Sequence, residues 1–115
     1  MNRLLKSEIY LAHLNPTVGS EIAKPRPVLI VSNDINNQYD DTITILPITS
    51  STEKIYPFEV FLAKGEGGLT VDSKAKANQI RTIDNLRLKK RFGKISEEKL
   101  NEIENAILIH LEIEK

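Results

Sequence analysis

Most of the chain is divided into short runs in which apolar and polar residues alternate, the pattern typical of strands with one buried face. Residues 8–14 (EIYLAHL) and 42–49 (TITILPIT) show this alternation, the second with a turn predicted near Pro47. Residues 58–62 (FEVFL) place their first, third and fifth side chains, all apolar, on one face. Residues 27–31 (PVLIV) are apolar throughout, which predicts a strand buried on both faces.

The middle of the chain is predicted to turn, extend and then form a short helix. Residues 64–68 (KGEGG) are a turn signal, and residues 70–82 (TVDSKAKANQIRT) follow as an extended run. That run places three polar residues on one side: Lys74, Lys76 and Asn78. Asp84 is predicted to cap a short helix over residues 85–91 (NLRLKKR), which Gly93 ends.

The last segment has a different period, that of an amphipathic helix. Ser96 is a good N-cap, and Glu97 and Glu98 suit the positive end of a helix dipole. Apolar residues then recur at helical spacing: Leu100, Ile103, Ile107, Leu108 and Leu111. Several strands followed by one helix predict a mainly β fold, a small antiparallel barrel with a C-terminal α-helix packed on it.

The composition is that of one globular domain spanning residues 1–115. A hydrophobic content of 40% supports a core, and 115 residues suit one compact domain. The chain has no cysteine, which excludes a disulfide scaffold, a thiol nucleophile and a thiolate zinc site, and is typical of a reducing compartment. No run approaches the roughly 20 apolar residues of a membrane span, and the basic N-terminus lacks a signal-peptide core. We therefore expect a cytoplasmic protein that contacts no membrane.

The net charge is zero, but the charges are unevenly distributed. Residues 74–94 contain eight basic residues and one acid, Asp84, whereas residues 97–115 contain six glutamates and two lysines. A basic strip is the electrostatic footprint of a protein that binds polyanions such as nucleic acid. The alternative is an ordinary solvated surface.

The sequence motifs of metal and nucleotide enzymes are absent. His13 and His110 are far apart and neither is accompanied by a carboxylate cluster, so neither a metal site nor a cofactor is predicted. A histidine acid–base pair could serve an RNase, but His110 lies beside the apolar stripe of the last helix, so both histidines are predicted to be structural. Gly67 and Gly68 are not followed by the lysine of a phosphate-binding loop, and no serine sits in a nucleophile elbow.

Arg26 is the most distinctive residue for chemistry, because it stands between two prolines at the start of an apolar run. Pro25 and Pro27 restrict the backbone around it, and a guanidinium on a stiff mount is a preorganised anion clamp. The segments 47–51 (PITSS) and 78–82 (NQIRT) also lie at predicted strand ends, where side chains can converge. The alternative is a surface arginine beside edge prolines.

Five motifs follow one another along most of the chain: IYLAHLNPTVGSE, RPVLIVSND, PITSS, YPFEV and QIRTID. They stand in the same order and at similar spacing in the MazF/PemK family of toxin endoribonucleases, which the chain resembles over about residues 8–111. The resemblance implies a small SH3-like antiparallel barrel of the CcdB/PemK type and a homodimer. It also implies metal-independent, sequence-specific cleavage of single-stranded RNA, and neutralisation by a MazE-like antitoxin whose acidic segment lies along the substrate groove.

In the chemistry that the resemblance implies, the ribose 2′-hydroxyl attacks the adjacent phosphate and leaves a 2′,3′-cyclic phosphate and a 5′-hydroxyl end. The nucleophile belongs to the substrate, so the protein has to hold the backbone in line and stabilise the charge of the phosphorane. Arg26 matches the family's catalytic arginine in RPV, and Thr49 matches its threonine in PxTS. The resemblance and the basic strip assign RNA binding to Ser20, Asn33, Ser50, Lys74, Lys76, Asn78, Gln79 and Arg81.

The chain departs from the family pattern at two positions. Lys24 stands where the first loop commonly has a glycine, and Asn78 stands where the family often has an acidic residue. Because Asn78 cannot act as a base, Glu21 in the family's GSE sequence is the remaining candidate for that catalytic role.

Two rival functions remain on the same fold. The first is a gyrase inhibitor of the CcdB type, but those inhibitors end in a tryptophan-containing tail and this chain has no tryptophan. The second is a non-catalytic RNA-binding module, which would not need Arg26 and Thr49 together.

Overall fold

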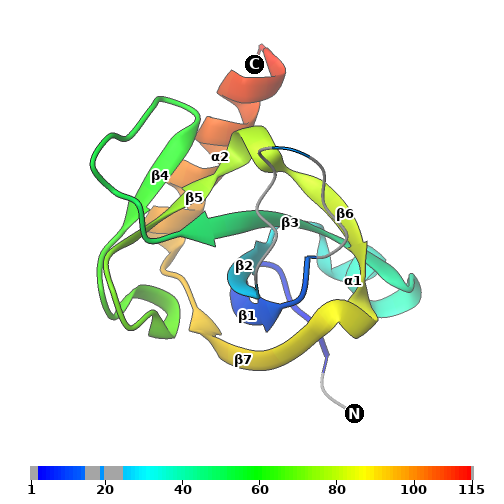
Figure 1. The fold of residues 1–115 in the computed structure, drawn as a ribbon. Helices are drawn as coiled ribbons and strands as arrows, with labels where there is room; N and C mark the ends of the chain where they lie inside the picture. Colours follow the sequence, from blue (N-terminus) through cyan, green and yellow to red (C-terminus); the bar gives the residue numbers. More distant parts are fainter. Residues whose placement is uncertain (1–2, 15–18, 20–24, 115) are drawn as a thin grey trace.

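The computed structural model describes residues 3–14, 19 and 25–114, and its main feature is one strongly curved antiparallel sheet (Figure 1). The described sheet has seven strands: β1 (Glu8–Ala12), β2 (Arg26–Ile30), β3 (Thr42–Thr49), β4 (Glu59–Leu62), β5 (Ser73–Lys76), β6 (Arg81–Asp84) and β7 (Leu88–Lys94). Six of them follow the order β4-β5-β3-β2-β1-β7, and β6 pairs with β3. Within the described residues β4 and β7 are not paired with each other, so the barrel is open between them.

Two α-helices accompany the sheet in the described part of the chain: α1 (Asp34–Tyr39) and α2 (Glu97–Leu111). Asn33 caps α1, because its side chain accepts a hydrogen bond from an amide of the first turn at 2.8 Å. Ser96 caps α2 as predicted, accepting from an amide of the first turn at 3.2 Å. The apolar stripe of α2 reaches the core at Ile103, which is 0% exposed, but Leu111 is 48% exposed because the last turn extends beyond the sheet (Figure 1).

Two apolar clusters pack on the two faces of the curved sheet, and β2 contributes to both. Leu29 belongs to the cluster that includes Ile103 of α2, whereas Val28 and Ile30 belong to the other cluster. Val28, Leu29 and Ile30 are each 0% exposed. The predicted two-sided burial of this strand is confirmed, and so is the predicted fold class, mainly β with a C-terminal helix.

The structure corrects the prediction at β3, which continues through Pro47 to Thr49 instead of turning. Pro47 lies opposite Val28 in the sheet, and the fixed φ of proline is compatible with extended backbone. The next residue, Ile48, is 1% exposed, so its burial favours continuation of the strand. The extra residues carry Thr49 to the end of β3 that faces the start of β2.

The extended run predicted over residues 70–82 is interrupted by a turn of 3₁₀ helix, η2 (Ala77–Gln79). β5 and β6 pair with opposite ends of β3, and the chain leaves the sheet between them. Asn78 therefore does not share a strand face with Lys74 and Lys76, contrary to the prediction.

The helix predicted over residues 85–91 is also wrong. A single 3₁₀ turn forms there, η3 (Asn85–Arg87), capped by the side chain of Asp84. The following residues form β7 and pair with β1. Strand pairing and the packing of Leu88 and Phe92 against the two apolar clusters override the helix propensity of this lysine-rich and arginine-rich run.

Candidate active site

Arg26 and Thr49 are brought together by the pairing of β2 with β3. The register places Val28 opposite Pro47. Because the strands are antiparallel, Arg26 at the start of β2 then faces Thr49 at the end of β3. The two strand ends converge, as their positions in the sequence predict.

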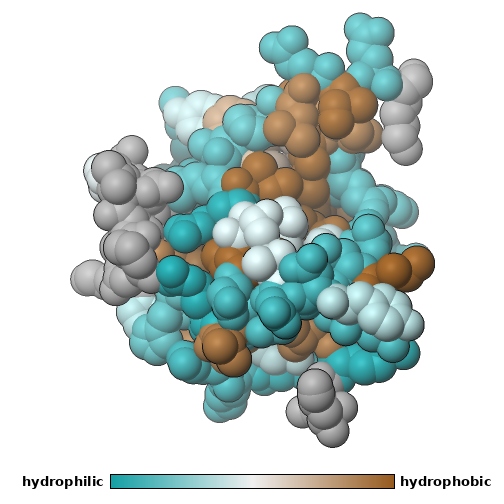
Figure 2. Space-filling model, turned by 90° about the vertical axis from the view of Figure 1, so that its right-hand side faces the viewer, coloured by the Kyte–Doolittle hydropathy of each residue, from teal (hydrophilic) through white to brown (hydrophobic). Residues whose placement is uncertain are grey.

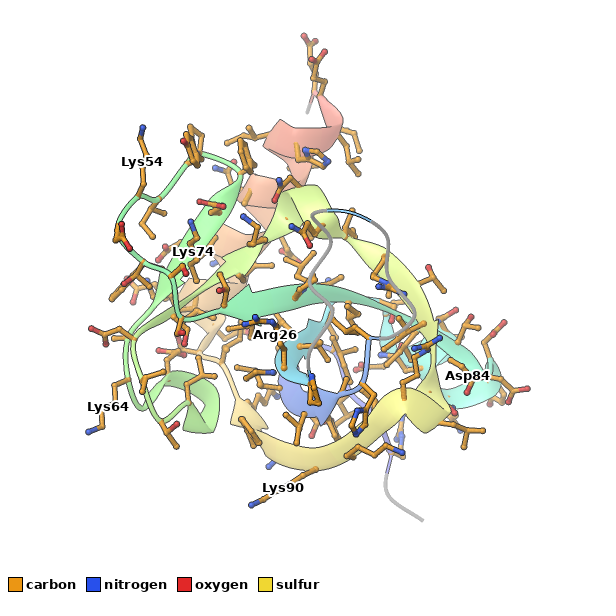
Figure 3. All side chains as sticks on the ribbon, viewed as in Figure 1. Arg26, Lys54, Lys64, Lys74, Asp84 and Lys90 are labelled. Atoms are coloured by element: carbon orange, nitrogen blue, oxygen red, sulfur yellow. The ribbon has the colours of Figure 1, made fainter. Side chains whose placement is uncertain are left out.

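The two residues line a pocket of about 270 Å³ that combines one cation with hydroxyl groups and an apolar wall. The hydroxyls belong to Thr49, Ser50, Thr70 and Ser73. The apolar wall is formed by Pro25, Pro27, Ile48, Leu69, Val71 and Phe92. Figure 3 shows Arg26 near the middle of the molecule, beside β3. A cation, hydroxyl donors and an apolar wall together can hold an anionic group and an apolar group side by side.

The Nε atom of Arg26 is buried and has no hydrogen-bond partner among the described residues. A buried donor without a partner costs about 1–3 kcal/mol, and more where the group is charged. An anion in the pocket would accept from Nε, and the guanidinium fork can offer a phosphate two parallel donors. A donor without a partner at this position favours an anion as the ligand of the pocket.

The side chain of Thr49 is oriented by a hydrogen bond from the backbone two residues further along the chain. Its Oγ1 accepts a hydrogen bond from the amide of Ser51 at 3.3 Å. A hydroxyl that accepts through one lone pair still has its hydrogen to donate. Thr49 can therefore donate to the same anion that Arg26 would hold.

The predicted RNA-binding residues Lys74 and Lys76 are both bound to one carboxylate, Glu59 of β4. Lys74 Nζ lies 2.9 Å from Glu59 Oε1, and Lys76 Nζ lies 2.6 Å from Oε2. The Glu59 side chain is 1% exposed and that of Lys74 is 9% exposed. The two lysines predicted as part of a basic strip are thus paired with a carboxylate and partly buried, and their role in RNA binding stays a prediction.

Glu59 is held as a carboxylate by these neighbours. Burial raises the pKa of Glu59, but hydrogen bonds from Lys76, the amide of Tyr56 and Lys74 outweigh it, so the pKa lies below its ordinary value of 4.5. The network of Glu59, Lys74 and Lys76, which we call the buried charge triad, joins two lysine side chains to one carboxylate.

The remaining predicted residues lie away from the Arg26 pocket or outside the described residues. Asn33 caps α1 and lines a different pocket of about 440 Å³ with Ile80 and Ile107. Asn78 and Gln79 lie in η2, and Arg81 on β6 donates to the carbonyl of Leu14 at 3.4 Å. Three residues of the first loop lie outside the described residues: Ser20, Glu21 and Lys24.

Sequence reasoning missed the part of the pocket that follows the glycine pair. η1 (Glu66–Gly68) packs against β7, and a Cβ on Gly68 would lie 2.2 Å from the carbonyl oxygen of Phe92. Gly68 also has a φ of +82°, a conformation that favours glycine. This close approach places Thr70 at the pocket, and the doublet Gly67-Gly68 was the sequence signal that could have indicated it.

Among the described residues, no three His, Cys, Asp or Glu side chains are grouped so as to hold a metal ion. His13 and His110 are both exposed. No described helix has the length and apolarity needed to cross a bilayer.

Comparison with known proteins shows sequence similarity to one family of toxins over most of the chain. A family profile described as PemK-like, MazF-like toxin of type II toxin–antitoxin systems matches residues 6–111. The endoribonuclease MazF9 of Mycobacterium tuberculosis is 39% identical over 113 residues, which cover 94% of this chain and 96% of the relative. The endoribonuclease MazF of Staphylococcus saprophyticus is 39% identical over 107 residues, which cover 92% of this chain and 89% of the relative.

Solved structures agree on the fold. The crystal structure of MazF from Deinococcus radiodurans superposes with a TM-score of 0.85 at 23% identity, covering 98% of this chain and 100% of the other. A mycobacterial endoribonuclease in complex with its cognate antitoxin superposes with a TM-score of 0.79 at 22% identity, covering 100% of this chain and 99% of the other.

Proposed function

Because the chain belongs to the PemK/MazF family of toxins of type II toxin–antitoxin systems, we propose that it is an endoribonuclease that cleaves single-stranded RNA in the Arg26 pocket. The observation that supports this proposal most directly is that Arg26, whose Nε has no hydrogen-bond partner among the described residues, lines one pocket together with Thr49. The relatives named endoribonuclease support the same reaction class.

In the proposed reaction the ribose 2′-hydroxyl attacks the adjacent phosphorus, and the bond to the 5′-oxygen breaks. The products are a 2′,3′-cyclic phosphate and a 5′-hydroxyl end. Negative charge develops on the non-bridging oxygens, where Arg26 Nε and the hydroxyl of Thr49 donate hydrogen bonds. Donors already in place stabilise that charge without reorganisation.

No metal ion is needed in this scheme, because the substrate supplies the nucleophile and Arg26 supplies the positive charge. A guanidinium does not release its proton in proteins, so the 2′-hydroxyl proton must pass to another group. Glu21 remains the proposed base. Sequence specificity is proposed to arise from the groove beyond the pocket.

The test is RNA cleavage by purified variants with divalent metal chelated. Arg26→Ala is expected to lower the rate at least about 100-fold, as the loss of one transition-state donor does. Arg26→Lys is expected to restore little, because lysine lacks the planar fork. Arg3→Ala, an exposed arginine outside the pocket, serves as the matched control. A near wild-type rate for Arg26→Ala would exclude the mechanism, and a wild-type protein that binds but never cleaves RNA would indicate a binding module.

We further propose a homodimer. The end of α2 and the residues just after it expose three large apolar side chains: Ile109, Leu111 and Ile113. Figure 2 shows apolar side chains gathered toward this end of the molecule. A contact with a second chain would remove this surface from water, which is favourable in proportion to its area.

The proposed protein partner is a MazE-like antitoxin with an acidic, extended segment. Complexes with an antitoxin occur among the solved neighbours, including one from Deinococcus radiodurans. A carboxylate of such a segment would satisfy Arg26 as a phosphate does. Lys74 and Lys76 are expected to attract this acidic segment less strongly than two free lysines would, because Glu59 already binds both.

A further inference from the structure

The loop from Ser50 to Phe58 connects β3 to β4. It begins at Ser50, which lines the Arg26 pocket, and it carries an aromatic pair. The rings of Tyr56 and Phe58 are stacked, with their centroids 5.4 Å apart and their planes 2° apart. The Nζ atom of Lys54 lies 5.3 Å from the centre of the Tyr56 ring. Tyr56 is 43% exposed. We call Lys54, Tyr56 and Phe58 the aromatic platform.

The buried charge triad holds the backbone of this platform in place. The amide of Tyr56 donates to Glu59 Oε1 at 2.9 Å, and Lys74 Nζ donates to the carbonyl of Lys54 at 2.7 Å. Charge-assisted hydrogen bonds in a buried setting are strong. The loop is therefore fixed by a network whose side chains are between 1% and 18% exposed.

The Phe58 ring and its backbone also contact neighbouring elements. The His110 ring of α2 lies 6.2 Å from the Phe58 ring at an angle of 55°. The carbonyl of Phe58 accepts from the amide of Ala77 at 3.0 Å. The platform is thus attached both to α2 and to η2, the turn that carries the predicted groove residues Asn78 and Gln79.

The spacing from the pocket to the platform follows from the strand register. Thr49 lies opposite Lys74 on β5, and Glu59 lies opposite Lys76. Strands rise about 3.3 Å per residue and lie about 4.8 Å apart. Glu59, at the foot of the platform, is therefore displaced from Thr49 by about 7 Å along β5 and by two strand spacings, about 10 Å, across the sheet. Figure 3 shows Lys54 and Lys74 on the same side of Arg26. A single strand whose phosphate sits on Arg26 can reach the platform within a few nucleotides.

We propose that the aromatic platform is a stacking subsite for an unpaired base of the RNA that is cleaved at Arg26. This inference rests on the proposed function, because it takes RNA as the ligand of the pocket. An exposed aromatic ring beside a cation is how proteins hold single strands without regard to sequence, the ring stacking on the base and the cation serving the backbone. The Lys54 side chain is exposed and has several rotatable bonds. A base can therefore displace its ammonium group from the Tyr56 ring, and the ammonium group can then bind a phosphate of the same strand. The platform adds affinity and fixes the path of the strand, rather than reading a particular base.

The experiment measures the affinity of a fluorescent, uncleavable 2′-O-methyl RNA of about 12 nucleotides and mixed sequence. Tyr56→Leu removes the ring but keeps apolar bulk and the amide that binds Glu59. It is expected to raise Kd at least about fivefold, the lower end of the loss for one stacked base. Tyr56→Phe keeps the ring and is expected to retain binding. The control is Tyr39→Leu, because Tyr39 is the other strongly exposed tyrosine, at 78%, and lies on α1.

Cleavage assays separate this proposal from the proposed function. If the wild-type protein cleaves RNA and Tyr56→Leu raises KM more than it lowers kcat, both proposals are supported. Equal Kd values for Tyr56→Leu and Tyr39→Leu in a protein that cleaves RNA would overturn the platform and leave the function intact. Unchanged RNA affinity combined with loss of dimer or of antitoxin binding would also overturn it, by showing a protein contact. Absence of cleavage by the wild-type protein would overturn the proposed function. The comparison of RNA affinities between Tyr56→Leu and Tyr39→Leu would still test the platform.

Discussion

Replacing Glu59 by glutamine tests how strongly the buried charge triad stabilises the fold. The substitution preserves the shape and removes one negative charge from a side chain that is 1% exposed. Lys74 and Lys76, whose side chains are 9% and 18% exposed, are then left as two cations without a carboxylate. Breaking a buried ion pair by removal of one partner costs about 3–5 kcal/mol. Because both lysines keep some contact with water, we expect the lower end, about 3 kcal/mol of unfolding free energy.

Urea unfolding of the wild type and of Glu59→Gln measures this cost. The midpoint is expected to fall while the slope stays unchanged, because the same surface is exposed on unfolding. Thermal unfolding should show a decrease of about 10 °C in Tm for a domain of this size. Glu53→Gln is the matched control, because Glu53 is an exposed glutamate of the same loop.

The pH dependence gives an independent test of the same network. The pKa of Glu59 is lower in the folded protein than its ordinary value of 4.5. A carboxyl with a lowered pKa contributes stability that is complete above the unfolded pKa and disappears as the pH falls through the folded value. The stability difference between wild type and Glu59→Gln should therefore be largest near neutral pH and shrink below about pH 4.5.

Two results would refute the reasoning. A cost below about 1 kcal/mol would mean that the lysines find water or other partners in the variant. A difference that does not change between pH 7 and pH 3 would mean that the charge of Glu59 is not what stabilises the protein. Replacement of all three residues, by Glu59→Leu, Lys74→Met and Lys76→Leu, is expected to recover most of the loss, because no buried charge remains unpaired.

Three further predictions concern the backbone, the assembly and the partner. Gly68→Ala should destabilise the protein by about 2 kcal/mol or more in urea unfolding, because its Cβ would lie 2.2 Å from the Phe92 carbonyl at a φ of +82°. Gly65→Ala is the control, since Gly65 has a φ of +98° but nothing within 4 Å of the added atom, and an equal loss in both variants would show that the clash is unimportant. Light scattering at micromolar concentration should give about twice the chain mass of 13.0 kDa, and the monomer mass would contradict the homodimer. An acidic antitoxin peptide should compete with uncleavable RNA for the protein, whereas simultaneous binding of both would place the peptide outside the Arg26 pocket.

The elements that the sequence determines by itself are those specified by neighbouring residues. The cap at Ser96 and the 3.6-residue spacing through Ile107 define α2 within a few turns of chain. The unbroken apolar run of β2 specifies burial on both faces wherever the strand is placed. The prolines around Arg26 mark the residue that the structure places in the pocket, and they do so without knowledge of any distant contact.

Tertiary structure decided the features that depend on strands meeting from distant parts of the chain. Residues 88–91 have helix-forming side chains, and only the pairing with β1 makes them part of a strand. Lys74 and Lys76 read as an open basic face, because nothing in the local sequence shows that β4 places Glu59 beside them. Likewise Thr70 and Phe92 reach the pocket only because Gly68 packs against β7. Periodicity and capping act over a few residues, whereas register, charge pairing and pocket shape are set by which strands lie side by side.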